Sequence, residues 1–401
     1  MNDFIFSCPT KFVFGQGYTD KVGEEISEFA WNRGIILSGG ASAEKSGTLE
    51  RVRKSLKKAG IDYVEYSGVR PNPEVKQVHE SIKLARDNDV DFVLAVGGGS
   101  TIDAAKATAY GYYYEGDVWD FHEGKAKISK MLPIAAIPTI PAAGSESSSS
   151  CVISNDAIQI KKGTDSQLSR PKLAIMDPEL TFTLPQYQTA AGVADMISHI
   201  CERYFSGTGQ SAISDNFSTG LIRAIIDAAL IVKDQPDCYD ARATLMWAST
   251  LAHNDITGCG LNSIPEIRAG GWENHALEHA MSAVNVKVTH GAGLAVIMPA
   301  WMRYVWKEDA KRFLKFGYDV FGIKPKNEDN NSIEAAVCEI IDSLQNFFVE
   351  LGLPRTMTEL GLTNEDIDPI IASVKHTKGL EFGSFKILSL EDARKIYESA
   401  L

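Results

Sequence analysis

Up to about residue 185, the hydrophobic pattern alternates between short runs rich in β-branched residues and longer stretches with apolar residues at helical spacing. The short runs predict strands, and the longer stretches predict helices. We expect strands at 34–38, 63–66, 92–96, 133–138 and 172–176, helices over about 48–59 and 74–88, and a hairpin that joins 151–154 to 158–161. Because strands that alternate with helices form parallel βαβ units, this part predicts an α/β domain with a parallel sheet.

From Pro185 to Leu401 the β-branched runs almost disappear, and Ala, Ile, Leu and Met recur at helical spacing. This part predicts an all-helical domain, in which the polar stretch 324–331 is a surface loop between helices. A chain of 401 residues, 44% of them hydrophobic, is long enough to bury two cores. We therefore expect two domains, one over residues 1–184 and one over residues 185–401.

The charge balance excludes several classes of partner. A net charge of −12 gives nucleic acid or an acidic membrane surface no electrostatic reason to bind, so a small molecule is the expected partner. The N-terminus lacks the basic and apolar regions of a secretion signal, and no stretch approaches the roughly 20 apolar residues that cross a bilayer. The six cysteines are far apart and form no CxxC motif. These features predict a soluble, cytoplasmic protein with reduced thiols.

A glycine-rich turn follows the strand at 92–96. Gly97, Gly98, Gly99 and Ser100 lie between that strand and the helical run that contains Asp103. Glycines let a backbone approach a diphosphate closely, and the N-terminus of the next helix offers unpaired N–H groups. The turn therefore predicts a cradle for a dinucleotide in a Rossmann-like sheet, with Asp103 as a further candidate for cofactor contact and catalysis. A tight turn that binds nothing is the alternative.

A second glycine-rich turn, with Gly39, Gly40 and Ser42, follows the strand at 34–38. In dinucleotide folds an acidic residue near this point accepts the adenosine ribose hydroxyls and repels a 2′-phosphate. Glycine and serine stand here instead, and Lys161 or Lys162 of the hairpin could supply positive charge. The turn favours NADP, with NAD as the alternative because Glu44 is close in sequence. For the two lysines, a solvated hairpin tip is the competing interpretation.

Hydroxyl groups follow the strand at 133–138 in the segment PTIPAAGSES and the serines after it. Thr139, Ser145 and Ser148 would lie at the carboxyl edge of the parallel sheet, where ligands bind in open α/β folds. These three residues are further candidates for cofactor binding.

The helical half carries five candidate metal ligands. Asp195 and His199 are four residues apart, as are His275 and His279, so each pair shares one face of a helix, and His290 follows in THG. Burying a carboxylate within AGVADMISHI costs several kcal/mol unless a cation or a donor compensates it. One carboxylate with imidazoles suits Fe(II), Zn or Co, and suits Ca or Mg less.

The histidines do not form a zinc-protease motif, and four of them are not expected to bind metal. HALEH is not HExxH, because Glu278 directly precedes the second histidine, so the general base of a zinc protease is missing. A lone histidine in an apolar helix is more often a hydrogen-bonded core residue than a ligand, and we expect this of the four others, His79, His122, His253 and His376.

Taken together, the motifs resemble the iron-containing alcohol dehydrogenases, in particular the branch of NADPH-dependent butanol dehydrogenases and broad aldehyde reductases. The likeness covers essentially the whole chain. It rests on PTKFVFG, VRPNPE, AVGGGSTIDAAK, PTIPAAGSES, MDPELTFTLP, GVADMISH, HALEH and THGAGLAVIMPAWM.

The resemblance implies a dehydroquinate synthase-like architecture, with the active site in the cleft between the two domains and a homodimer that pairs near the N-terminal strands. It implies Asp195, His199, His275 and His290 as the metal ligands, and His279 as a histidine near the substrate. This sequence departs from the family in two places. The spacer 280–289 is one residue longer than is common, which makes the reach of His290 an open question, and Ala143 stands where many members have threonine.

The predicted function is hydride transfer between NAD(P)H and a small aliphatic aldehyde or alcohol, with Fe(II) as the expected metal and Zn as the alternative. His279 is a candidate proton relay or a residue that only orients its neighbours. A polyol dehydrogenase of the glycerol or propanediol type is the alternative. A sugar-phosphate cyclising lyase would need an Arg/Lys cluster, whereas the motifs are mostly apolar. A non-catalytic cofactor- or metal-binding protein is the most distant alternative.

Overall fold

The computed structural model describes residues 1–206, 209–262 and 269–401. The chain divides into two compact units. The sheet unit comprises Ser7–Leu184 and Gln235–Thr250, and the helical unit comprises Met1–Phe6, Pro185–Asp234 and Leu251–Leu401. The hydrophobic pattern did not indicate that residues 235–250 belong with the sheet, or that the first six residues belong with the helices.

A six-stranded parallel sheet forms the centre of the sheet unit, with the strand order β1-β8-β5-β4-β2-β3. Its strands are β1 (Lys11–Phe14), β2 (Arg33–Ser38), β3 (Asp62–Ser67), β4 (Phe92–Gly97), β5 (Ile134–Pro138) and β8 (Leu173–Met176). Strand β6 (Ser150–Asn155) pairs with β7 (Ile160–Asp165) in a separate antiparallel hairpin. The five predicted strands and the hairpin are confirmed, and β1, whose apolar run is very short, was not predicted.

Helices cover both faces of the sheet, because alternate residues of each strand point to opposite sides. Ile36 packs with Val52 and Leu56 on one face, while Ile35 and Leu37 pack with residues of helix α5 (Gly99–Gly111) on the other. The helices are α1 (Val22–Ser27), α2 (Ser42–Lys45), α3 (Thr48–Lys58), α4 (Val75–Asp87), α5 (Gly99–Gly111) and α6 (Trp119–His122). Because β2, β4 and β5 are parallel neighbours, their carboxyl ends lie at the same edge of the sheet.

The second unit is built mainly from helices. They are α7 (Gln186–Tyr204), α8 (Ala212–Asp234), α10 (Glu273–Val284), α11 (His290–Val305), α12 (Ala310–Phe321), α13 (Asn330–Glu350), α14 (Ile367–Lys378) and α15 (Leu390–Ala400), and α9 (Tyr239–His253) reaches it with its last residues. The predicted fold class is confirmed. One correction is needed, because this half also contains a small antiparallel pair, β9 (Glu381–Phe382) with β10 (Leu388–Ser389).

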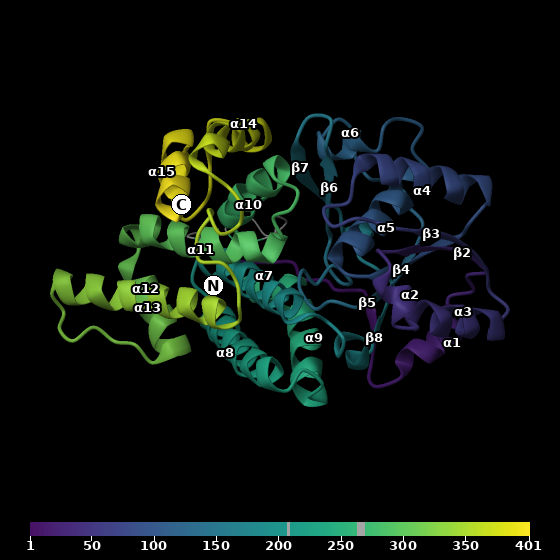
Figure 1. The fold of residues 1–401 in the computed structure, drawn as a ribbon, viewed down its shortest axis with the longest axis horizontal. Coiled ribbons are helices and arrows are strands. Elements are labelled where there is room, and N and C mark those ends of the chain that lie inside the picture. The colour runs from purple at the N-terminus through teal and green to yellow at the C-terminus, as the bar shows by residue number, and fades with distance from the viewer. Residues whose placement is uncertain (207–208, 263–268) are drawn as a thin grey trace. The chain divides into compact units, whose positions relative to one another are not determined.

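Helices α7 and α11 pack against each other along much of their length (Figure 1). Almost every residue of α7 from Thr189 onward is buried, and so is most of α11. Within the described residues, no helix is long and apolar enough to span a membrane. This buried pair of helices, together with α10, carries the candidate metal site.

Candidate metal and cofactor sites

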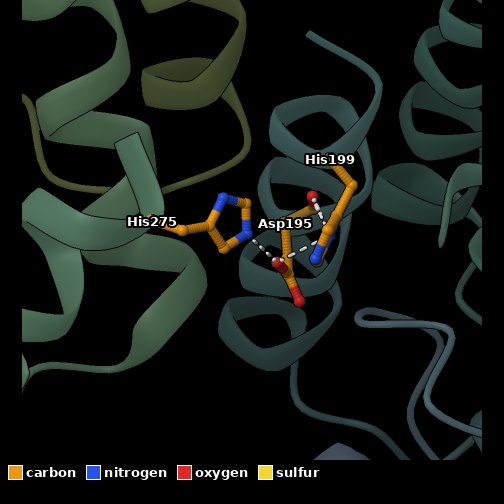
Figure 2. A group of neighbouring side chains, drawn as sticks. All are labelled: Asp195, His199 and His275. Atoms are coloured by element: carbon orange, nitrogen blue, oxygen red, sulfur yellow. Dashed lines mark hydrogen bonds and ion pairs between the residues drawn. The ribbon is translucent and has the colours of Figure 1, made fainter. Parts of the chain in front are cut away.

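Asp195, His199 and His275 form a buried cluster inside the helical unit (Figure 2). Asp195 and His199 lie one turn apart on α7, and His275 comes from the first turn of α10. The Nδ1 atom of His199 lies 3.1 Å from Asp195 Oδ1, and the Nε2 atom of His275 lies 3.7 Å from the same oxygen. Residues eighty positions apart in the chain thus meet at one carboxylate.

His290 joins this cluster from the start of α11. Its Nε2 atom lies 3.6 Å from Asp195 Oδ1. Gly291 makes the approach possible, because a Cβ atom at this position would overlap the backbone oxygen of Ala191, one turn before Asp195 on α7. The longer spacer before His290 therefore does not remove its imidazole from the cluster.

The atoms of the cluster fit a divalent cation. The Nδ1 proton of His199 goes to the backbone oxygen of Asp195, at 2.9 Å. Among the described residues, Asp195 Oδ1 and His275 Nε2 have no hydrogen-bond partner, although both are buried. A buried carboxylate oxygen without a hydrogen bond, facing three imidazoles, has the composition that Fe(II) or Zn prefers.

Charges within the cluster shift its acid–base equilibria. Burial alone would raise the pKa of Asp195, but the neighbouring His199 and His290 outweigh it and hold the pKa well below its usual range. Burial lowers the pKa of His199 to about 4, against the opposing effect of Asp195. Asp195 is therefore ionised and His199 is neutral near pH 7, and these are the protonation states that a metal requires.

His279 lies beside His290, on the side of the cluster where Glu278 also reaches it. Its ring centre is 5.3 Å from that of His290 and 6.1 Å from that of His275. Glu278, His279 and His290 bring their ligand atoms within 4.8 Å of one another. The imidazole is half-buried, unlike those of His199 and His275.

Three residues near the cluster were not identified as site residues from the sequence. His253, at the end of α9, has its ring centre 3.8 Å from that of His199. Trp272 places its ring 6.1 Å from His199, and the Arg203 guanidinium lies over that ring. Helical spacing could not find His253 or Trp272, because they reach the site from other parts of the chain.

Of the four histidines that we expected in the core, two are buried and two are exposed. His122 is buried and lies between Tyr110 Oη and the backbone oxygen of Lys162, as predicted. His253 is also buried, and Arg203 lies 3.4 Å from its Nδ1 atom. The prediction is wrong for His79 and His376, which are exposed because they lie on the solvent faces of α4 and α14.

The two glycine-rich turns meet at the carboxyl edge of the sheet. Gly97 ends β4, and a Cβ atom there would lie 2.5 Å from Thr101 Oγ1. Thr139 donates its backbone N–H to the Gly97 oxygen at 3.0 Å, and the Cβ position of Gly39 lies 3.4 Å from Thr101 Oγ1. Gly98 and Gly99 follow at the start of α5. The predicted cradle residues thus lie together, with Gly40 and exposed Ser42 continuing from β2.

Three other residues predicted to bind the cofactor, Asp103, Ser145 and Ser148, form hydrogen bonds within the protein instead. Ser145 donates to Asp103 Oδ1 at 2.6 Å, and Val152 donates its N–H to Asp103 Oδ2 at 2.9 Å. The buried Lys106 ammonium donates to Ser145 Oγ and to the backbone oxygen of Ser148. Asp103, Ser145 and Ser148 therefore hold residues 145–152 against α5, directly behind the cradle.

Lys161 and Lys162 lie within strand β7, not at the tip of the hairpin. Lys161 is buried, and its charge is among those that lower the pKa of Asp103, which burial raises. The Nζ atom of Lys162 lies 3.7 Å from Glu123 Oε1. The interpretation of the pair as a solvated tip is therefore wrong.

A parallel sheet with glycine-rich turns at its carboxyl edge, joined to a helical unit with a buried Asp/His cluster, is typical of enzymes that combine a dinucleotide with a metal ion. Two family models match the chain. The model described as iron-containing alcohol dehydrogenase matches residues 9–178, and the C-terminal model of the Fe-containing alcohol dehydrogenase family matches residues 189–401. The chain belongs to the iron-containing alcohol dehydrogenase family, and it is an oxidoreductase.

Individual relatives agree with this assignment over their whole length. The chain is 40% identical to NADH-dependent butanol dehydrogenase A of Clostridium acetobutylicum and 33% identical to the NADPH-dependent aldehyde reductase YqhD of Escherichia coli, with all of each chain covered. The crystal structure of NADH-dependent butanol dehydrogenase A from Thermotoga maritima superposes with a TM-score of 0.93 at 40% identity, covering 100% of this chain and 99% of that one. The resemblance indicated by the sequence motifs is confirmed.

Proposed function

We propose that the protein is a metal-dependent reductase of small aliphatic aldehydes that uses NADPH and also oxidises the corresponding alcohols. The observation that carries the proposal is the convergence of three imidazoles on Asp195 Oδ1, where Asp195, His199 and His275 are buried and His290 is half-buried. The relatives are named for butanol and for aldehydes, which supports a small and largely uncharged substrate.

Asp195, His199, His275 and His290 would hold the metal ion, with Fe(II) as the proposed metal and Zn as the alternative. A divalent cation bound there supplies positive charge that stabilises the negative charge developing on the substrate oxygen. The ionised, buried Asp195 carboxylate would compensate the positive charge of the cation. The neutral His199 imidazole would offer the cation a nitrogen lone pair. Burial of the cluster excludes bulk water and so strengthens these electrostatic interactions.

The cradle of Gly97, Gly98, Gly99 and Ser100 would hold the cofactor diphosphate, with Thr139 beside it. NADPH is proposed because Gly39, Gly40 and Ser42 leave no carboxylate at the end of β2. The Glu44 carboxylate is paired with the Arg53 guanidinium at 2.8 and 2.9 Å, which offsets its repulsion of a 2′-phosphate. One relative is named as NADH-dependent and another as NADPH-dependent. Measuring kcat/KM with each cofactor therefore tests the proposed preference for NADPH. A higher kcat/KM with NADH would contradict it.

His279 is proposed as the residue through which the substrate oxygen exchanges its proton with solvent. Its half-buried imidazole lies beside His290 and outside the proposed ligand set, so it can contact both the site and water. An imidazole titrates near neutral pH, which suits this role.

The decisive experiment mixes protein of measured metal content with NADPH and butanal, and follows the nicotinamide absorbance. We expect the absorbance to fall with the iron-loaded protein and to stay constant with an Asp195→Asn variant. A panel of C2–C6 aldehydes, with glycerol and 1,3-propanediol as alcohols, separates the proposal from a polyol dehydrogenase. No turnover with Fe, Zn, Co or Ni restored would contradict the proposal.

We further propose that the protein is a homodimer and that it works in the cytoplasm, where NADPH is available. Strand β1 is an edge strand of the sheet and pairs only with β8 among the described strands. Phe14 on this edge is 36% exposed and contacts Trp247, which is 39% exposed. An apolar edge strand is a surface that a second copy of the chain could cover.

A further inference from the structure

We infer that Glu202 and Glu278 are the positioning residues of the metal site, each holding one imidazole by its Nδ1 atom so that its Nε2 atom faces Asp195. This inference rests on the proposed function, because it concerns the proposed ligands. Neither glutamate belongs to the ligand set implied by the sequence motifs, and both side chains are completely buried.

Glu202 reaches the site from α7. It lies seven residues after Asp195 and three after His199, so the three side chains share one face of the helix. Glu202 Oε1 accepts the Nδ1 proton of His275 at 3.1 Å and the backbone N–H of His275 at 2.9 Å. The first N–H groups of a helix have no partner within it, and His275 lies in the first turn of α10. One carboxylate oxygen therefore fixes both the start of α10 and the plane of the ring.

Glu278 plays the corresponding part for His290. It lies on α10 between His275 and His279, and its Oε2 atom pairs with His290 Nδ1. Gly293 leaves space for this carboxylate, because a Cβ atom there would lie 2.8 Å from Glu278 Cγ and 3.1 Å from Oε1. In the THGAG motif, Gly293 thus leaves space for the Glu278 side chain, and Gly291 leaves space for the backbone of α7.

All three imidazoles have an oxygen atom at Nδ1, but only His275 and His290 turn their Nε2 atoms to Asp195 Oδ1, because His199 Nδ1 itself lies 3.1 Å from that oxygen. His199 gives its Nδ1 proton to the Asp195 backbone oxygen on its own helix, while His275 and His290 use carboxylates from other helices. The Nε2 atoms of His275 and His290 then lie 3.7 and 3.6 Å from Asp195 Oδ1. A carboxylate on Nδ1 fixes the tautomer and makes Nε2 a stronger electron donor than a neutral carbonyl would.

The test measures metal affinity and not only activity. Each variant is loaded with Co(II), its dissociation constant is measured by competition with a chelator, and its visible absorption spectrum is recorded as a report on ligand geometry. We expect Glu202→Gln and Glu278→Gln to weaken Co(II) binding by about tenfold, and Glu202→Ala by about a hundredfold, with altered spectra. Glutamine keeps the volume and an acceptor oxygen, so these two variants decide the question if the alanine variant fails to fold.

Asp215→Asn is the matched control. Asp215 is another buried carboxylate of the helical unit, but it pairs with the Arg312 guanidinium at 2.7 and 2.8 Å. We expect this variant to melt at a lower temperature with unchanged Co(II) affinity and spectrum. If both glutamine variants bind Co(II) as tightly as the wild type and give its spectrum, the inference is overturned. If the wild type itself binds no divalent metal, the proposed function fails instead.

Discussion

The neutral imidazole of His122 illustrates how its surroundings set the chemistry of a single residue. Its Nδ1–H donates to the backbone oxygen of Lys162 at 2.8 Å, and its Nε2 atom accepts from Tyr110 Oη at 2.8 Å. Burial lowers its pKa from the usual 6.5 to about 4, and the nearby Lys162 charge acts in the same direction. The same effect acts on His199. The spacing of the histidines in the sequence gives no information on their pKa, whereas burial lowers the pKa of both His122 and His199.

The lowered pKa of His122 predicts a pH-dependent stability. The folded state binds the proton more weakly than the unfolded chain, so this contribution is complete above pH 6.5 and is lost progressively between pH 6.5 and pH 4. At pH 5 the loss amounts to about 2 kcal/mol. Between pH 7.5 and pH 5, the melting temperature of the wild type should therefore fall further than that of His122→Gln. An equal fall in both proteins would contradict this assignment.

At His279, a change of one residue should separate proton transfer from metal binding. His279→Ala should lower turnover by about a hundredfold, because a positioned acid or base contributes at least that much. Metal content per chain should stay at the wild-type value, since the four proposed ligands remain. His79→Ala, at an exposed histidine paired with Asp117, is the control and should change neither quantity. Loss of bound metal in His279→Ala would show that this residue is a ligand and not a relay.

At the scale of elements, helix positions followed from periodicity, but the contacts between helices did not. The i,i+4 spacing predicted that Asp195 and His199 share a face of α7, and the structure confirms it. Which helices would approach that face depended on Gly291 and Gly293, whose small size becomes meaningful only against a specific neighbour. Glu202 was overlooked for the same reason, because its partner His275 comes from another helix.

The close packing of α11 on α7 predicts the effect of adding one methyl group. In Gly291→Ala the new Cβ would overlap the Ala191 backbone oxygen, so α11 must move away and take His290 with it. We expect a loss of stability of about 1–3 kcal/mol together with weaker metal binding, measured by thermal melting and chelator competition.

Gly220→Ala is the control for this change, because Gly220 lies inside α8 and its Cβ position has only the Arg223 side chain nearby, at 3.9 Å. Alanine at this position should stabilise the helix by roughly 0.5–1 kcal/mol. A stable, fully metal-binding Gly291→Ala variant would refute the importance of the close contact.

For the whole molecule, the exposed edge of the sheet is the feature that bears on assembly. Phe14→Asp should convert the proposed dimer into a monomer, because a charge would replace apolar surface at the edge strand β1. Sedimentation equilibrium measures the mass directly. Ile213→Asp, on α8 with a 76% exposed side chain, should leave the mass unchanged. A dimer that persists in Phe14→Asp would place the interface elsewhere.

The sequence by itself determined the local elements, the glycine-rich cradle and the identities of the proposed ligands. Those features depend on periodicity, backbone freedom and residue chemistry, which act over a few neighbouring positions. Only the tertiary structure decided that His290 reaches Asp195, that Glu202 and Glu278 contact two of the imidazoles, and that Asp103 holds residues 145–152 against α5. These outcomes depend on distances between elements far apart in the chain, which are set by close packing in three dimensions.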